Sequence, residues 1–516
     1  MLFNSYGFIF LYLPVVLLGF FWLARINHAY ASAWLALASL FFYGYWNPTY
    51  VGLLLCSIIC NYKFGLWIVK FGIRHEAGRK KQLFILAITA NLLLLAYFKY
   101  ANFFIGSINS LANTQWSLGE ILLPLGISFF TFTQIAYLVD TYQGKVKEYN
   151  FIHYTLFVTY FPHLIAGPVL HHKEMMPQFA LASTYRCNYE NISVGMTIFF
   201  IGLFKKVIIA DGMAAYVGPV FSVPGTLLFI EAWGGALCYT LQLYFDFSGY
   251  SDMAIGLSRM FGVVLPLNFH SPYKSVNIIE FWRRWHMTLS RFLRNYLYFT
   301  LGGNRKGKMR RYINLMATML LGGLWHGAGW TFVVWGGLHG LYLVINHGWH
   351  AVRRKLGQNP DQPLSSPMHV FAVLITFISV VAAWVVFRSD NIGAATTMLK
   401  AMAGCNGIML PDTWLPKLGA LGHWLATAGV TFGPGNRLVG IDAFGLIALL
   451  MLIVWFAPNT QQIMAANKPA LDIPEHETTK SFLWRPTALF ATLVWLLAFY
   501  AISNVSNPSA FLYFQF

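Results

Sequence analysis

The stretch that decides the fold is Phe8-Ile-Phe-Leu-Tyr-Leu-Pro-Val-Val-Leu-Leu-Gly-Phe-Phe-Trp-Leu23, which contains no charged residue. It approaches the roughly 20 apolar residues that cross the hydrocarbon core of a bilayer. No basic residue precedes it, and no small-residue cleavage site comes before Arg25. We therefore interpret it as a retained membrane span rather than a removable signal peptide.

Similar apolar stretches recur along all 516 residues, of which 57% are hydrophobic and only 10% are charged. Soluble domains carry about 25% charged residues. We predict an all-α, polytopic integral membrane protein with roughly ten to thirteen crossings and one membrane domain over residues 1–516. The candidate membrane segments are 5–24, 31–46, 50–70, 82–98, 121–139, 151–170, 192–212, 226–245, 312–346 (long enough for two), 368–387, 441–457 and 482–502.

The net charge of +17 is explained by the positive-inside rule, and we expect no nucleic-acid partner. The basic loop Arg74–Lys81 is then cytoplasmic, which places the N-terminus on the opposite, periplasmic side. The richest basic stretch, 283–311, is expected on the cytoplasmic side as well. Residues 404–442 are rich in Gly, Pro and Trp and predict a long periplasmic loop or a partly re-entrant segment.

A histidine lies inside one of the apolar stretches, in Leu321-Gly-Gly-Leu-Trp-His-Gly-Ala-Gly-Trp330. Ionisable groups inside membrane segments are costly and indicate function, and imidazole exchanges protons near neutral pH. The alternative is a core imidazole bonded to a backbone carbonyl. The glycines around His326 favour close helix packing or close approach to a ligand, whereas we interpret His339 as a packing residue.

The segment 280–301, drawn as one helix, carries arginines on one stripe and aromatic residues on another, with His286 on a third edge. This pattern is typical of a helix at the membrane interface, and such a helix need not be catalytic. Two carboxylates, Asp246 and Asp252, end another apolar run. They could pair with basic residues of 283–311 or form the ion path of a transporter.

The segment Phe161-Pro-His-Leu-Ile-Ala-Gly-Pro168 is followed by His171, His172, Lys173 and Glu174. Helix breakers next to clustered imidazoles indicate a broken helix bordering a cavity. The histidines show no standard ligand spacing, and we predict no metal site.

Taken together, these segments resemble the membrane-bound O-acyltransferase family, in particular its bacterial polysaccharide O-acetyltransferases. The matching blocks follow one another in the family's order and cover most of the chain from about 120 to 400. They are 161–168, 244–256, 281–290 with Leu301-Gly-Gly-Asn-Arg305, 324–328 and Trp384-Val-Val-Phe-Arg388.

The resemblance implies a ring of tilted and re-entrant helices around a central tunnel, with a C-terminal extension over 401–516. His326 matches the family's catalytic histidine, and His286 matches a second histidine of this bacterial branch, so both are the candidate catalytic residues. The candidates for binding the substrate or donor are Trp325, Arg283, Arg284, Asn304, Arg305, Asp246 and Asp252.

The implied activity is transfer of acetyl groups from a cytoplasmic donor for O-acetylation of an exported polysaccharide such as alginate. The donor is expected to be acetyl-CoA or an acyl carrier, with no bound cofactor, and a periplasmic acetyltransferase is the expected partner. The alternatives are D-alanyl transfer to teichoic acid, a transporter, and a catalytically silent scaffold of an export complex. The absence of repeated halves lowers the transporter alternative.

Overall fold

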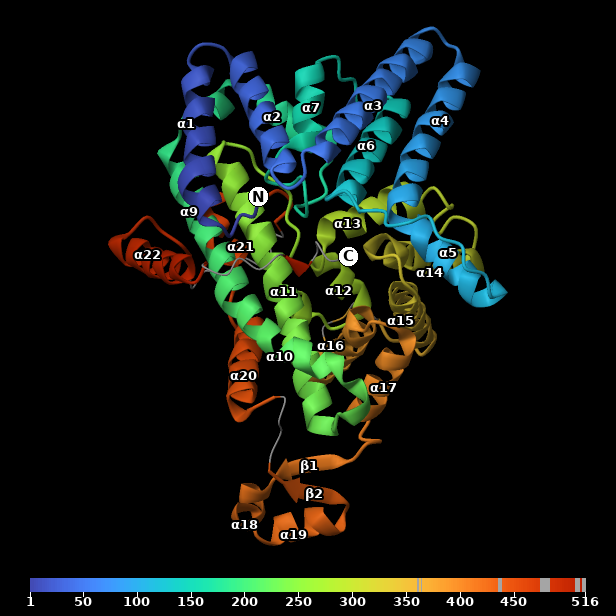
Figure 1. Cartoon of the computed structure of the whole chain (residues 1–516), viewed down its shortest axis with the longest axis vertical. Helices are drawn as coiled ribbons and strands as arrows, with labels where there is room; N and C mark the ends of the chain where they lie inside the picture. Colours follow the sequence, from blue (N-terminus) through green and yellow to red (C-terminus); the bar gives the residue numbers. More distant parts are fainter. Residues whose placement is uncertain (360–361, 363, 435–438, 474–482, 506–510, 513–516) are drawn as a thin grey trace.

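The computed structural model describes residues 1–359, 362, 364–434, 439–473, 483–505 and 511–512 (Figure 1). Its architecture is helical, as the sequence predicted, with one small sheet. The N-terminal helices gather at one end of the long axis, and the sheet lies at the opposite end (Figure 1).

The N-terminal helices are apolar on most of their surface and are tied together by a few polar contacts. Asn27 caps the second helix by accepting a hydrogen bond from Ala29 N. Asn61 and Asn91 exchange two side-chain hydrogen bonds inside the α3–α4 hairpin, at 3.2 and 2.6 Å, and such amide pairs hold membrane helices together. The elements are η1 (Gly7–Tyr12), α1 (Leu13–Ala24), α2 (His28–Gly44), α3 (Thr49–Ile73), α4 (Ala77–Leu95), η2 (Ala96–Tyr100) and α5 (Ala101–Ala112).

The centre of the molecule is α11, a helix of 32 residues that is buried along most of its length. It packs closely on α9, because Gly195 faces the carbonyl of Gly256 and Gly202 faces that of Gly249. Figure 1 shows α9 and α10 running alongside α11. The elements of this region are α6 (Ile127–Tyr142), α7 (Phe151–Thr159), α8 (His172–Phe179), η3 (Ala182–Tyr185), α9 (Tyr189–Phe204), η4 (Lys205–Ala210), α10 (Asp211–Ser222), η5 (Pro224–Thr226), α11 (Phe229–Met260) and η6 (Pro272–Lys274).

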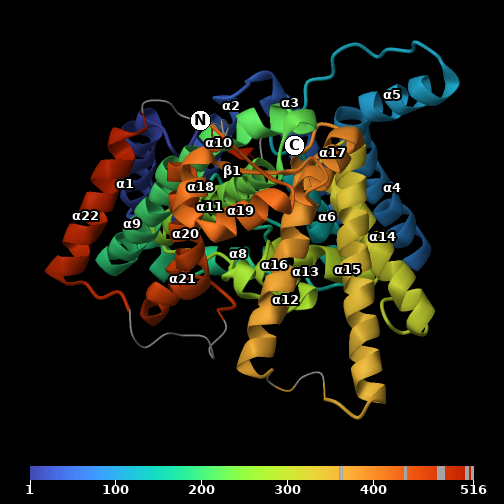
Figure 2. The same cartoon turned by 90° about the horizontal axis from the view of Figure 1, so that it is seen from below.

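Three long helices, α14, α15 and α16, stand side by side in the C-terminal half (Figure 2). A second apolar core forms where they meet α10 and α11. The elements are α12 (Ile278–Arg284), α13 (Met287–Phe292), η7 (Leu293–Tyr298), α14 (Lys308–His326), α15 (Trp330–Lys355), α16 (Ser366–Arg388), α17 (Ile392–Met402), α20 (Ile441–Phe456), α21 (Thr460–Ile463), η9 (Ala465–Asn467) and α22 (Ala488–Ser503).

Within the described residues, five helical stretches are long and apolar enough to cross a membrane, fewer than the ten to thirteen crossings predicted. The predicted stretch 312–346 divides into two helices, α14 and α15, as its length allowed, whereas 151–170 is helical only over α7. Helices of fewer than 18 residues, such as α2, α6, α7, α20 and α22, account for much of the difference. The five stretches are Gly7–Ala24, Thr49–Ile73, Ala77–Ala112, Tyr189–Ser222 and Ser366–Arg388, with shorter apolar helices at Asp442–Phe456 and Ala488–Ser503.

Residues 404–442 contain more regular structure than the predicted loop. Strands β1 (Ile408–Pro411) and β2 (Val430–Gly433) pair in parallel, with Ile408 opposite Val430. The connection between them contains η8 (Asp412–Trp414), α18 (Leu415–Leu418) and α19 (Ala420–Thr427). This unit projects from the helical body (Figure 1), and its periplasmic location stays a prediction.

The segment 280–301 is not the single helix that its amphipathic pattern predicted. α12 ends at Arg284, and His286 adopts φ 44°, a left-handed conformation that is uncommon for residues other than glycine. The chain then restarts as α13 and η7. The pattern of polar and apolar residues correctly indicated helical structure within each short piece. It did not indicate the break at residues 285–286 that separates α12 from α13.

Candidate active site

His326 is the last residue of α14 and is buried. Its ring lies in an aromatic enclosure, with ring centroids 5.0 Å from Trp325, 5.0 Å from Trp335 and 5.5 Å from Phe387. These neighbours come from α14, α15 and α16, so three helices define the position of one imidazole. The site is therefore largely shielded from water.

Close packing of α14 on α15 sets this geometry. Gly323 and Gly336 face each other across the two helices, and a methyl group on Gly336 would collide with the backbone carbonyl of Met319. The glycine spacing seen in the sequence thus serves close helix approach. Beyond His326 the chain passes through Gly327, Ala328 and Gly329 before α15 begins.

Replacing Gly336 with alanine is expected to destabilise the protein by about 1–3 kcal/mol, because overpacking forces the two helices apart. Thermal unfolding of the purified protein in detergent measures the effect. Gly348→Ala is the matched control on the same helix, since nothing lies within 4 Å of the added methyl group. Equal unfolding temperatures for the two variants would contradict the packing argument.

The second histidine, His286, lies at the break between α12 and α13 and is completely buried. Its Nδ1 is 3.1 Å from Asn268 Oδ1. An amide oxygen only accepts, so Nδ1 carries the proton and Nε2 is the basic nitrogen. Burial lowers the pKa of His286 to about 3, which keeps the ring neutral at physiological pH.

The two predicted catalytic histidines are neighbours. The ring centroids of His286 and His326 are 6.4 Å apart and inclined at 58°. Trp325 contacts both rings, at 5.0 Å from His326 and 6.2 Å from His286. Forty residues of sequence and a broken helix separate the pair, and the fold brings them into one enclosure.

Asn268 is a site residue that the sequence interpretation missed. Its Oδ1 also accepts from Thr288 Oγ1 at 2.9 Å, and its Nδ2 donates to Ser251 Oγ at 3.2 Å. It thereby fixes the orientation of His286 and joins α11 to α13. The available signal was one amide in the apolar run Val263–Phe269.

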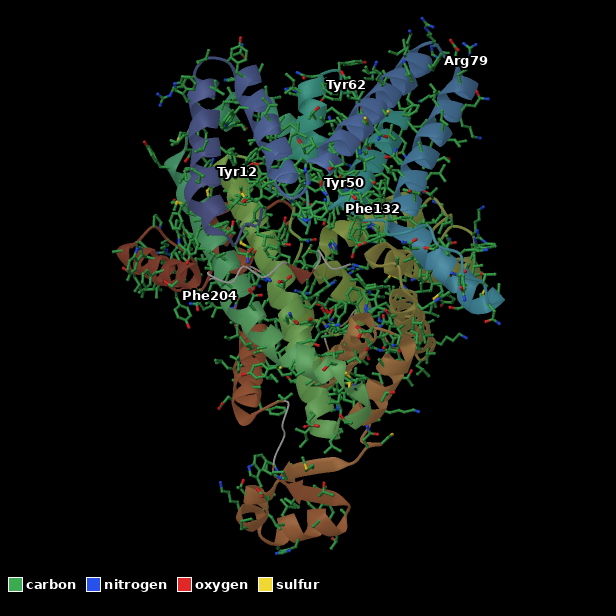
Figure 3. The ribbon with its side chains drawn as sticks, viewed as in Figure 1. Tyr12, Tyr50, Tyr62, Arg79, Phe132 and Phe204 are labelled. Atoms are coloured by element: carbon green, nitrogen blue, oxygen red, sulfur yellow. The ribbon has the colours of Figure 1, made fainter. Side chains whose placement is uncertain are left out.

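Trp325 is buried and packs on Phe132 and Phe129 of α6, at 5.3 and 5.4 Å. In Figure 3, Phe132 lies toward the middle of the molecule, near the end of α4 that is opposite to Arg79. Trp325 therefore joins the site to α6. Its predicted role in binding the donor or substrate stays a prediction.

The predicted basic residues do not gather around the histidines. Arg283 is exposed, and Arg284 pairs with Glu280 at 2.8 Å and donates to the carbonyl of His270. Asn304 and Arg305 are exposed in the turn before α14. Because α14 has 19 residues, this turn lies roughly 28 Å along the helix from His326.

Asp246 and Asp252 pair with lysines outside residues 283–311, so one of the two alternatives left open by the sequence is wrong. Lys206 Nζ bonds Asp246 at 2.6 Å, and Lys205 Nζ bonds Asp252 at 2.7 Å. Both lysines belong to η4, which packs directly on α11. Asp246 and Asp252 therefore link α11 to η4, and they are not part of the enclosure that contains His286 and His326.

The break predicted around 161–168 is present, because α7 ends at Thr159 and α8 begins at His172. His171 Nδ1 donates to the hydroxyl of Tyr296 at 2.8 Å, and that hydroxyl donates to Asp140 at 3.0 Å. Burial, together with nearby cations, lowers the pKa of His171 to about 3. This polar cluster is separate from the His286–His326 enclosure.

A pocket of about 290 Å³ adjoins the turn after His326. Among the described residues, no three His, Cys, Asp or Glu side chains gather as metal ligands, and the role of metals stays at the level of the sequence prediction. The imidazoles of His286 and His326 can exchange protons with a reactant at this site. The pocket is lined by Phe98, Lys99, Asn102, Ile121, Leu123, Gly327, Ala328 and Phe332.

Comparison with known proteins identifies the family of the chain. The family described as membrane-bound O-acyltransferases matches residues 40–384. The chain belongs to the membrane-bound O-acyltransferase family. Across its whole length it is 46% identical to a peptidoglycan O-acetyltransferase of Helicobacter pylori, 98% of which is covered.

Two further relatives are similar to this chain over a smaller part of its length. A probable alginate O-acetylase of Pseudomonas aeruginosa is 44% identical over 78% of this chain and 75% of the relative. A teichoic acid D-alanyltransferase of Streptococcus thermophilus is 26% identical over 52% of this chain and 69% of the relative. The predicted family, helical polytopic fold and O-acyltransferase activity are confirmed.

Proposed function

We propose that this membrane-bound O-acyltransferase moves acetyl groups from a cytoplasmic thioester donor across the inner membrane for O-acetylation of an exported glycan. The observation that carries this proposal is the enclosure of His326 and His286, with ring centroids 6.4 Å apart. It holds two imidazoles away from water at the end of α14, beside a pocket. Acyl transfer to a hydroxyl requires a base in such an environment.

In the proposed reaction, His326 removes the proton of an acceptor hydroxyl as the hydroxyl oxygen attacks the thioester carbonyl carbon. The carbonyl becomes a tetrahedral oxyanion, which collapses to the ester and expels the thiolate. The thiolate then takes the proton from His326, which restores the neutral imidazole. His286, held as the Nδ1–H tautomer by Asn268, is placed to orient a reactant through Nε2.

The donor we propose is acetyl-CoA or an acetylated acyl carrier. The basic stretch 283–311 supports a cytoplasmic approach, because its cations attract phosphates or an acidic carrier protein. Arg283 and Arg305 are exposed and available for such steering. The Asn304–Arg305 turn lies far from His326 and suits a role at the entrance rather than in the chemical step.

Two glycans are candidates for the final acceptor, reached through a periplasmic acetyltransferase partner. Peptidoglycan is favoured by the full-length similarity to the Helicobacter pylori relative. Alginate is supported by the similarity to the Pseudomonas aeruginosa relative, which covers less of the chain. Measuring O-acetyl groups on both glycans in a strain lacking this protein distinguishes them, since only the true acceptor loses its acetyl groups.

The donor is tested with purified protein in nanodiscs. We expect thiol release from acetyl-CoA or from an acetylated carrier protein when a glycan acceptor is supplied, and no turnover of a D-alanyl carrier. Turnover of the D-alanyl carrier alone would replace the proposal with D-alanyl transfer, the activity named for the more distant relative.

A further inference from the structure

The helix that carries His326 ends without a conventional cap. The last four carbonyl groups of an α-helix have no partner within the helix, and many helices satisfy them with a left-handed residue just after the end. Here Gly327 leaves α14 in an extended conformation, with φ −158° and ψ 152°. The carbonyls around His326 must therefore be satisfied from elsewhere.

Two consecutive residues of η2 supply the missing donors. Tyr100 OH donates to the carbonyl of Leu324 at 2.9 Å. Lys99 Nζ donates to the carbonyl of Trp325 at 2.6 Å and to that of His326 at 3.1 Å. η2 is a π-helical turn, a local irregularity that is frequent at functional sites. A segment more than 220 residues away in sequence thus caps α14.

Lys99 is fully engaged in this cap. Its third hydrogen bond goes to Ser128 Oγ at 3.2 Å, so three acceptors match the three N–H donors of an ammonium group. The Nζ atom also lies 5.9 Å from the ring centroid of Trp325. The geometry is that of a clamp on the backbone of Trp325 and His326.

The clamp is also favourable electrostatically. The carboxyl end of a helix carries a partial negative charge, and a cation there is stabilising, especially where water is scarce. A lysine inside a membrane segment is costly and requires such compensation. Lys99 lies within the candidate span Ala77–Ala112, while a neutral hydroxyl serves the neighbouring carbonyl of Leu324. The end of α14 therefore receives the amino group of Lys99 at the carbonyls of Trp325 and His326, the two residues nearest the reaction.

The far side of Lys99 borders open space. It lines the pocket of about 290 Å³ together with Gly327 and Ala328, the residues that follow His326. The turn after α14 thus lies between this pocket and the ring of Phe332, which packs against Gly327. Without Lys99, the carbonyl of His326 would lose its hydrogen bond to Nζ at the edge of this pocket.

We infer that Lys99 is a positioning residue for acyl transfer. Its hydrogen bonds to the backbone carbonyls of Trp325 and His326 hold the His326 imidazole in the position that the reaction requires. This inference rests on the proposed role of His326 as the base. Lys99 does not itself touch the reacting atoms, because its three donors are occupied. Small displacements of a base matter greatly, since an error near 1 Å can lower a rate by about 100-fold.

The test compares Lys99→Met and Lys99→Arg in purified, nanodisc-embedded protein, with turnover expressed per folded molecule. For Lys99→Met we expect kcat to fall about 10- to 100-fold while the donor KM changes little. Lys99→Arg keeps the charge and several donors and is expected to recover a large part of kcat. Lys70→Met, at an exposed lysine of α3, is the control and should match the wild type.

A Lys99→Met protein with kcat within about two-fold of the wild type would overturn the inference. So would a raised donor KM at unchanged kcat, which indicates a binding role, or an Arg variant as impaired as the Met variant. The comparison uses whichever donor the wild type turns over. A wild type inactive with acetyl donors but active with a D-alanyl carrier thus rejects the proposed function and still tests Lys99.

Discussion

Replacing His326 with glutamine is expected to abolish acetylation of the target glycan while the protein remains in the membrane at normal abundance. Glutamine has a similar size and keeps hydrogen-bonding capacity, but it cannot accept a proton from a hydroxyl. General base catalysis contributes about 10²–10⁴-fold to rate. Trp335, Phe387 and Trp325 enclose His326 and limit access of water, and the other imidazole, His286, lies 6.4 Å away between ring centroids, so it does not occupy the position of the base. The measurement is glycan O-acetyl content, with kcat of the purified variant beside it.

His369→Gln is the matched control, because this imidazole is exposed near the start of α16. It should leave acetylation unchanged. Persistent acetylation in the His326→Gln strain would show that the imidazole only packs in the core. In that case the base lies elsewhere, and the scaffold alternative gains support.

The chemistry of the site was more predictable from sequence than its geometry. A histidine surrounded by glycines inside an apolar stretch is unusual enough to mark His326 without a structure. The proximity of His286 was implied only by family resemblance, since periodicity alone placed it on the edge of a continuous helix. His286 adopts a left-handed conformation, and its ring is held by Asn268, which lies in a different segment.

The ionic contacts show the same limit. The sequence indicates that Asp246 and Asp252 need partners, because buried carboxylates are costly. It does not indicate which cations reach them, since that depends on how η4 packs against α11. The dense basic stretch 283–311 was the more obvious source, yet two adjacent lysines of η4, directly after α9, are the partners.

The sequence did not indicate the contact between Lys99 and α14 for a related reason. It directly follows the apolar stretch 82–98, where a lysine ordinarily marks the end of a membrane segment. Its contact with α14 joins residues that lie 226 and 227 positions apart. Only the packed structure shows that this flanking lysine contacts α14, the helix that carries His326.

The second large effect is expected on stability, from Lys206→Met. Lys206 is buried and bonds Asp246 at 2.6 Å and Asp211 at 2.8 Å. Asp246 is also buried, and its other oxygen accepts from the backbone N–H of Leu512. Methionine fills a similar volume but leaves Asp246 without a cation. Breaking a buried ion pair from one side costs about 3–5 kcal/mol, so we expect a large fall in unfolding temperature and in membrane abundance.

The double variant Lys206→Met with Asp246→Leu separates charge from packing. Removing both charges eliminates the uncompensated carboxylate, and replacing a whole buried pair by apolar groups is often neutral. We therefore expect the double variant to be more stable than Lys206→Met alone, whereas Lys63→Met at an exposed lysine should change little. If the double variant were less stable than the single one, Asp246 would be needed for its bond to Leu512 rather than for its pairing with Lys206. The helix contact between η4 and α11 would then depend on hydrogen bonding more than on charge.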